Sequence, residues 1–304
     1  MTRRAWLQLA AAGAGHAALF GPAYAQSTQP LGVQLYTVRD KLGPEARATL
    51  EAIAAIGYKE LEVGRGDLPT LAPLAKSLGL QAVSTHIEAP LVTGDWTAWR
   101  AAARQMPMNL PPDKYTLAQA LDSAAAHGVK YAVVAYLMES ERRGTVEFYE
   151  KLADSLSRAG ELARGRGVTI GYHNHGFEFE ALPDGRRPLD VLIAGTDPTL
   201  VTFELDVFWV GITGADPVAL LEQHKGRIAL VHLKDKAADA ARATDERSVP
   251  PGAFREVGSG TLDFQAILKA ARAAGVRHYF VEQDHTPGDP VASLRKSFEY
   301  LRRL

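Results

Sequence analysis

Apolar, strand-like stretches alternate with amphipathic helical stretches eight times between residue 31 and the C-terminus. The β-branched and aromatic stretches predict strands over residues 32–36, 58–63, 80–86, 131–135, 168–173, 200–206, 227–232 and 276–282. The spacing of leucine, isoleucine and alanine predicts helices over residues 45–56, 68–78, 117–126, 146–163, 189–194, 217–224, 264–274 and 291–301. Most of these helices end at a glycine shortly before the next strand, as helix C-caps do.

Eight strand–helix units favour a closed (β/α)8 TIM barrel, an α/β fold of roughly 250 residues. A doubly wound open sheet alternates in the same way, but eight units favour closure. The chain has no GxGxxG motif after the first predicted strand and no P-loop, which weighs against a nucleotide-binding fold. We therefore expect a single barrel domain over residues 26–304.

The first 25 residues have the features of an export signal. Arg3 and Arg4 precede an apolar run rich in alanine and glycine, and a small-x-small site ends at Ala25. The arginine pair resembles a twin-arginine signal, so we expect residues 1–25 to be cleaved and the mature protein to be periplasmic. An ordinary signal peptide or an uncleaved anchor is the alternative.

Composition excludes several classes of site and partner. The 304-residue chain is 46% hydrophobic, has a formal net charge of −1 and contains no cysteine. Disulfides and thiolate metal sites are therefore impossible. Without a basic excess, we expect no nucleic-acid partner, and we expect no membrane association of the mature form. The oligomeric state cannot be read from the sequence.

Polar side chains with catalytic or metal-binding capacity gather at the C-terminal ends of the predicted strands. In a TIM barrel these ends form one rim, which carries the active site. His173 and His175 are two residues apart, so they should share a face at the end of their strand. The substrate-binding candidates from the other strand ends are Gln34, Tyr36, Glu62, His86 and Lys234.

Two histidines and two carboxylates lie near the ends of four successive predicted strands. These residues, His173, Asp206, His232 and Glu282, form a nitrogen and oxygen ligand set that suits one Mn, Zn, Co or Fe ion. Each has a plainer explanation, since a turn cap or a structural ion pair uses the same residue types. Glu204 has the same strand parity as Asp206. We assign the ligand role to Asp206, which lies nearer the strand end, and a structural pair to Glu204.

At these residues the chain resembles the sugar phosphate isomerase/epimerase superfamily, the xylose isomerase-like barrels that also include endonuclease IV. The resemblance covers nearly all of residues 26–304. The motifs that carry it are GVQLYTVRD (residues 32–40), GYHNHGFEFE (171–180), ELDVFWV (204–210), VHLKD (231–235), VGSGTLDF (257–264) and VEQD (281–284).

The resemblance implies a metal held by residues of the last four strands, with three ligands at Asp206, His232 and Glu282. At the fourth position many relatives carry glutamate in an ENHG-like motif, whereas this chain has His173. Because that glutamate also serves as an acid/base in the epimerases, two-carboxylate epimerisation is in doubt. Inosose dehydratase, in the same superfamily, has a similar His-x-His stretch. The resemblance thus makes His175 and Glu178 candidates for proton transfer, beside Glu282 as general base.

These observations predict a divalent-metal-dependent sugar isomerase or epimerase that removes a proton next to a carbonyl. The second reading is a metal-dependent lyase or dehydratase that acts on a keto-sugar, keto-glycoside or inosose. A sugar-binding accessory protein without turnover is the non-enzymatic alternative. A phosphodiesterase like endonuclease IV would need a basic groove, against which the acidic balance of the chain argues. The partner in each favoured case is a small carbohydrate.

Overall fold

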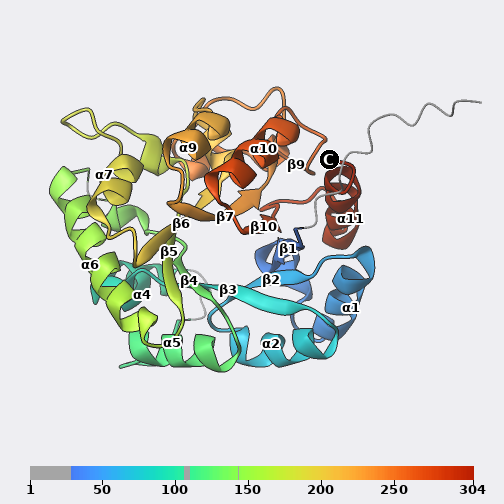
Figure 1. The fold of residues 1–304 in the computed structure, drawn as a ribbon, viewed down its shortest axis with the longest axis horizontal. Coiled ribbons are helices and arrows are strands. Elements are labelled where there is room, and N and C mark those ends of the chain that lie inside the picture. Colours follow the sequence, from blue (N-terminus) through green and yellow to red (C-terminus); the bar gives the residue numbers. More distant parts are fainter. Residues whose placement is uncertain (1–28, 106–109, 143) are drawn as a thin grey trace, which may run out of the picture.

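The computed structural model describes residues 29–105, 110–142 and 144–304. The predicted signal peptide, residues 1–25, lies outside the described residues. Eight parallel strands close into a barrel in the order β1-β10-β7-β6-β5-β4-β3-β2 (Figure 1). The barrel strands are β1 Leu31–Gln34, β2 Glu60–Gly64, β3 Gln81–Ile87, β4 Tyr131–Val134, β5 Thr169–His173, β6 Val201–Asp206, β7 Ile228–Leu233 and β10 His278–Val281. The predicted (β/α)8 TIM barrel is confirmed.

Helices surround the barrel, as Figure 1 shows, and bury their apolar faces against the strands. The helices are α1 Ala46–Ile56, α2 Leu68–Ser77, α3 Pro90–Thr93, α4 Thr97–Ala103, α5 Leu117–Ala126, α6 Val146–Arg164, α7 Pro188–Gly195, α8 Val207–Ile212, α9 Pro217–Gln223, α10 Phe264–Ala274 and α11 Pro290–Leu301. The three short helices α3, α4 and α8 lie in βα connections and were not predicted. Within the described part of the chain, no helix is long and apolar enough to cross a bilayer.

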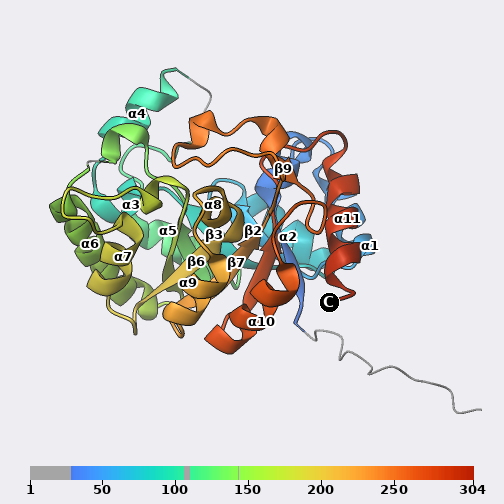
Figure 2. The same cartoon turned by 90° about the horizontal axis from the view of Figure 1, so that it is seen from above.

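The long connection after β7 folds back over the C-terminal ends of the strands. It carries a two-stranded hairpin, formed by β8 Asp235–Lys236 and β9 Phe254–Arg255. In Figure 2 this orange segment crosses above the strand ends, on the same side of the barrel as α4. The buried Asp235 holds it in place by accepting hydrogen bonds from the backbone N–H groups of Gly258, Gly260 and Leu262, at 2.8–3.1 Å.

The barrel interior below the C-terminal ends of the strands is filled by apolar side chains, which we call the apolar plug. A buried cluster of six residues occupies it, namely Val83, Tyr131, Val133, Ala229, Leu230 and Phe280. The Phe280 ring fits only because β1 has a glycine beside it: a Cβ on Gly32 would lie 2.4 Å from Phe280 Cδ1. The polar site therefore stands on an apolar plug, as expected for a barrel whose interior is packed core.

Replacing Gly32 with alanine is expected to lower the free energy of unfolding by about 1–3 kcal/mol, because the added methyl overpacks the plug. Urea unfolding followed by circular dichroism measures the change. Gly43→Ala is the matched control, since nothing lies within 4 Å of a Cβ there; it should change stability by less than about 0.5 kcal/mol. Equal stability of the two variants would show that Phe280 moves aside without cost.

Candidate metal centre and substrate cavity

A cavity of about 650 Å³ opens at the C-terminal ends of the barrel strands. Seven of the predicted site residues line it together: Gln34, Tyr36, His86, His173, His175, Lys234 and Glu282. Its volume falls within the range of about 300–1,000 Å³ that is typical of small-molecule sites. The structure thus brings predicted residues at or just beyond the C-terminal ends of strands β1, β3, β5, β7 and β10 to one cavity.

Four other predicted residues do not line this cavity, although all four are fully buried. Asp206 and His232 lie behind the cavity wall, and Glu62 lies deeper in the barrel. Glu178 accepts hydrogen bonds from Tyr172 Oη and from the backbone N–H of His175, both at 2.8 Å. Glu178 therefore supports the loop that carries His175 and does not face the cavity itself.

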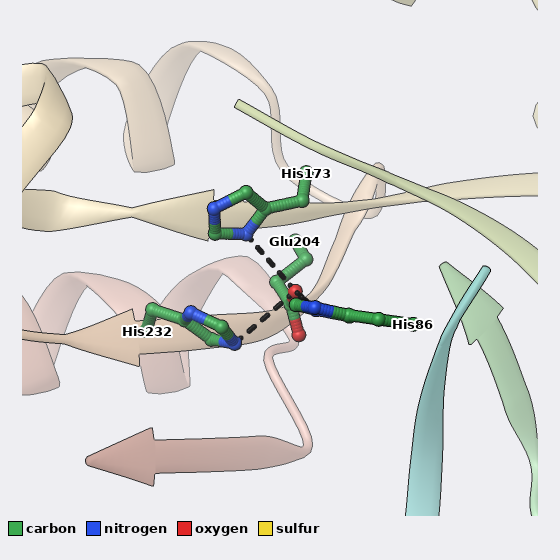
Figure 3. Close-up of side chains that lie close together, drawn as sticks. All are labelled: His86, His173, Glu204 and His232. Atoms are coloured by element: carbon green, nitrogen blue, oxygen red, sulfur yellow. Dashed lines mark hydrogen bonds and ion pairs between the residues drawn. The ribbon is translucent and has the colours of Figure 1, made fainter. Parts of the chain in front are cut away.

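Glu204 lies at the centre of a cluster of three histidines (Figure 3). Its Oε2 atom is 3.0 Å from His173 Nδ1, 3.1 Å from His86 Nε2 and 3.2 Å from His232 Nε2. Glu204 follows the strand register, which pairs it with His173 on β5. We call Glu62, His86 and Glu204, which lie on the inner side of His173 and His232, the floor of the site.

Glu62 completes the floor from β2. Its Oε2 atom is 2.6 Å from His232 Nε2 and 2.9 Å from His86 Nε2. Gln34 donates a hydrogen bond of 2.8 Å to the same oxygen, and the Ser84 hydroxyl donates to Oε1. Two carboxylates on the floor thus share histidine partners.

Asp206 and Glu282 lie on the outer side of the same two histidines, where His232 is paired in register with Asp206. Glu282 Oε2 is 2.8 Å from His232 Nδ1, and Asp206 Oδ2 is 3.9 Å from it and 3.8 Å from His173 Nε2. Lys234 Nζ lies 2.9 Å from Asp206 Oδ2 and 2.7 Å from Glu282 Oε2. We call His173, Asp206, His232 and Glu282 the rim set.

Electrostatics separates Asp206 from the floor carboxylates. Burial and Glu62 oppose ionisation of Glu204, yet the neighbouring histidines lower its pKa to about 2. Burial opposes protonation of His86, but Glu62 and Glu204 raise its pKa to about 9. On the rim, burial raises the pKa of Asp206 to about 6 despite the nearby Lys234. The floor carboxylates are therefore stabilised as anions by histidines, whereas Asp206 is less well compensated.

The charges in the site fit a bound divalent cation. Five buried or nearly buried carboxylates converge here, and Lys234 is the one lysine or arginine among the described residues that pairs with any of them. The five are Glu62, Glu204, Asp206, Glu282 and Asp284. Asp206 Oδ2 and Glu204 Oε1 are buried and accept no well-formed hydrogen bond. Histidine nitrogens with carboxylate oxygens are the donor set that Zn, Mn, Co and Fe prefer.

His175 is the predicted acid/base candidate with a free ring nitrogen. Its Nδ1 is buried without a hydrogen-bond partner. Burial, helped by the positive charges of Lys234 and Arg142, holds the pKa of His175 well below its usual value. The ring is therefore neutral at ordinary pH and packs 5.4 Å from the ring of Trp209 and 5.1 Å from that of Tyr136.

Sequence reasoning missed the aromatic wall of the cavity and its bracing. The wall includes Trp99, Tyr136, Trp209 and Phe254. Glu246, on the connection after β7, accepts hydrogen bonds from Tyr136 Oη and from the Arg142 guanidinium. This bracing joins the connection after β7 to the segment after β4. No motif indicates this bracing, because Tyr136, Arg142 and Glu246 lie in connecting segments without regular spacing.

The parallel barrel, with histidines and carboxylates gathered at its C-terminal end, places this protein among the TIM-barrel proteins with a candidate metal site. The sequence pattern of the xylose isomerase-like TIM barrel family matches residues 50–304, and the chain belongs to this family. The resemblance expected from the motifs is confirmed.

Individual relatives support the same placement. Inosose dehydratase of Geobacillus thermodenitrificans is 33% identical over 168 residues, which cover 52% of this chain and 55% of that protein. The chain thus spans little more than half the length of this curated relative. A sugar phosphate isomerase/epimerase structure from Parabacteroides distasonis has a TM-score of 0.72 at 24% identity, covering 92% of this chain and 96% of that one.

A third relative has been solved with a metal. The structure of the IOLI protein with a zinc atom has a TM-score of 0.63 and 16% identity, and it covers 90% of this chain and 98% of that one. At these identities, the two structural similarities show the fold alone.

The buried Glu178 predicts a specific pH dependence of stability. Burial raises the pKa of Glu178 to about 8 in the folded protein, against about 4.3 in an unfolded chain. Between these values the folded state binds one more proton than the unfolded state, so stability from this group falls as pH rises. Glu178→Gln, which keeps the shape and a donor, should gain stability relative to wild type between about pH 5 and pH 8. Urea unfolding at each pH measures this difference; parallel profiles would show that Glu178 is ionised when folded.

Proposed function

We propose that this protein is a divalent-metal-dependent enzyme that removes a proton from the carbon next to a carbonyl of a sugar-like substrate. The observation that carries the proposal is that Glu282, His175 and Lys234 line one cavity. The two histidines of the rim set, His173 and His232, are called the histidine pair below, and Glu282 contacts His232 at 2.8 Å. This first step is shared by sugar isomerases, epimerases and dehydratases. Family membership and the inosose dehydratase relatives support it.

The rim set would hold the ion. His173, Asp206, His232 and Glu282 offer two nitrogens and two carboxylates on the cavity side of the histidine pair. When bound, the ion supplies Lewis-acid polarisation of the substrate carbonyl. The relative with a zinc atom supports a metal in this fold, and the identity of the ion is open among Mn, Zn, Co and Fe.

Three residues of the chain would move or hold protons. Glu282 is ionised: burial opposes its charge, but Lys234 and His232 hold the pKa of its carboxyl well below the usual value. Such a carboxylate can accept a proton as general base. The neutral His175 lines the same cavity, where its free Nδ1 can accept a hydrogen bond or a proton. Lys234, held by three carboxylates, stays charged and can bind a substrate hydroxyl or an enolate-like oxygen. Gln34, Tyr36 and His86 would bind further hydroxyl groups.

Elimination of water is the second candidate reaction, and one observation favours it. An epimerase needs acid/base groups on both faces of the carbon, whereas His173 stands where the family's second carboxylate is expected. His173 Nδ1 is already engaged by Glu204 at 3.0 Å. A single carboxylate base matches a dehydratase, the activity named for the curated relatives. The proton that Glu282 takes from the carbon can pass to the leaving hydroxyl, which then departs as water.

We also propose that the mature protein acts after export. The support is the sequence of residues 1–25, with Arg3 and Arg4 before an apolar run. Conservative replacement of both arginines by lysine should leave the precursor in the cytoplasm, because the twin-arginine pathway reads the pair. Cell fractionation with immunoblotting measures this, and unchanged export would indicate an ordinary signal peptide.

The chemistry is tested by solvent exchange. The metal-loaded protein is incubated in D2O with a panel of ketoses and inososes, and NMR follows loss of the proton beside the carbonyl. We expect exchange with at least one substrate and a slowing of about 10²–10⁴-fold in Glu282→Gln, the typical contribution of a general base. A new enone absorbance identifies elimination, and a new sugar without it identifies isomerisation or epimerisation.

The control is Glu60→Gln, a buried glutamate of β2 that pairs with His278 outside the cavity. It should retain wild-type exchange. Ligand binding without exchange or product in the wild-type protein would reject an enzymatic role and favour a sugar-binding protein.

A further inference from the structure

The two floor carboxylates have no place in the proposed reaction. Glu62 and Glu204 are fully buried, with 0% and 1% of their surface exposed, and neither lines the cavity. Burying a carboxylate costs several kcal/mol unless it is paired. Two of them side by side, on strands β2 and β6, therefore need a specific explanation.

The strands are irregular where these two residues occur. The register of β2 against β3 shifts between Leu61 and Glu62. The register of β6 against β7 shifts in the same way between Phe203 and Glu204. Such irregularities re-aim the side chain that follows them and are common next to active sites. The barrel thus aims both carboxylates at the histidine pair.

Both histidines of the rim set turn one ring nitrogen toward these carboxylates. His173 Nδ1 is 3.0 Å from Glu204, and His232 Nε2 is 2.6 Å from Glu62. An ionised carboxylate only accepts hydrogen bonds, so these inward nitrogens carry protons. Of the opposite nitrogens, His173 Nε2 lies 3.8 Å from Asp206, and His232 Nδ1 is 2.8 Å from Glu282 and donates to it here. An ion bound on the rim side would take the place of that Nδ1 proton.

The floor is itself held rigidly. Ser84 and Gln34 donate to the two oxygens of Glu62. The side-chain carbonyl of Gln34 in turn accepts a hydrogen bond of 3.0 Å from the backbone N–H of Tyr36 at the cavity mouth. Glu62 therefore cannot rotate away from His232 without breaking contacts that also order the cavity wall.

We propose that Glu62 and Glu204 are positioning residues that fix the tautomer and orientation of His232 and His173, so that the ion binds on the rim side. This inference rests on the proposed function, because it assigns partners to that metal site. A hydrogen bond from the far nitrogen of a histidine ligand to a carboxylate fixes the ring and makes it a better ligand.

The alternative is that the floor itself binds the ion, through His86, His173, Glu204 and His232, whose ligand atoms lie within 4.8 Å of one another. One observation opposes it. Glu62 Oε2 already accepts a hydrogen bond at 2.6 Å from His232 Nε2, the nitrogen that lies toward Glu204 and that such an ion would need.

Titration of the metal-free protein with Co²⁺ tests the inference, with calorimetry for affinity and visible absorption for coordination geometry. The variants are Glu204→Gln, Glu62→Gln and Asp206→Asn, with Glu60→Gln as the matched buried glutamate–histidine pair. We expect wild type and Glu60→Gln to bind one ion alike. Glu204→Gln and Glu62→Gln should still bind one ion, but about 10–100-fold more weakly and with an altered spectrum. Thermal melting without metal identifies any variant that fails to fold.

The other outcomes overturn the inference in distinguishable ways. Wild-type affinity and spectrum in both floor variants would show that the two carboxylates do not position the ligands. Complete loss of the ion in Glu204→Gln, with wild-type binding in Asp206→Asn, would make Glu204 a ligand and place the ion on the floor. Absence of Co²⁺ binding in the wild-type protein would reject the metal centre of the proposed function and the inference with it.

Discussion

Buried carboxylates that share histidine partners are the constraint on which the C-terminal end of this barrel depends. Side chains two residues apart on a barrel strand point inward at successive depths, so Glu204 and Asp206 face the same histidine pair from opposite sides. Each anion is costly to bury alone. Together with His86, His232 and Lys234, the carboxylates form one connected network in which moving any member leaves another charge without a partner.

The sequence predicts the fold and seven of the residues that line the cavity, but not the depth of each residue. Period-two strands and helix-ending glycines place eight units, and strand ends then identify the residues that reach the cavity. Parity alone could not separate Glu204 from Asp206, because both point inward. The register shifts before Glu62 and Glu204 decide where these side chains end, and they depend on pairing between strands. Glu178, placed near His175 in sequence, was expected at the cavity, but it lies in the 3-10 turn Phe177–Phe179 after β5 and does not line the cavity.

The signal for Glu204 was nevertheless present. A carboxylate two residues before a rim carboxylate on the same strand must lie one layer deeper in a packed barrel. A similar argument applies to Glu62, the member of the floor that comes from β2. The loop residues Arg142 and Glu246 carry no such periodic signal, since their meeting joins parts of the chain about a hundred residues apart. Loop-to-loop bracing of this kind emerges only from the folded chain.

The apolar plug around Phe280 has a kinetic meaning. Because the plug fills the barrel beneath the histidine pair, the cavity is closed at its inner end. Among the described residues, its one opening lies at the C-terminal ends of the strands. In the proposed reaction, substrate would enter and product would leave by this one opening. A product that stayed bound would exclude the next substrate molecule, so inhibition by product would be competitive and product release would be in series with every turnover.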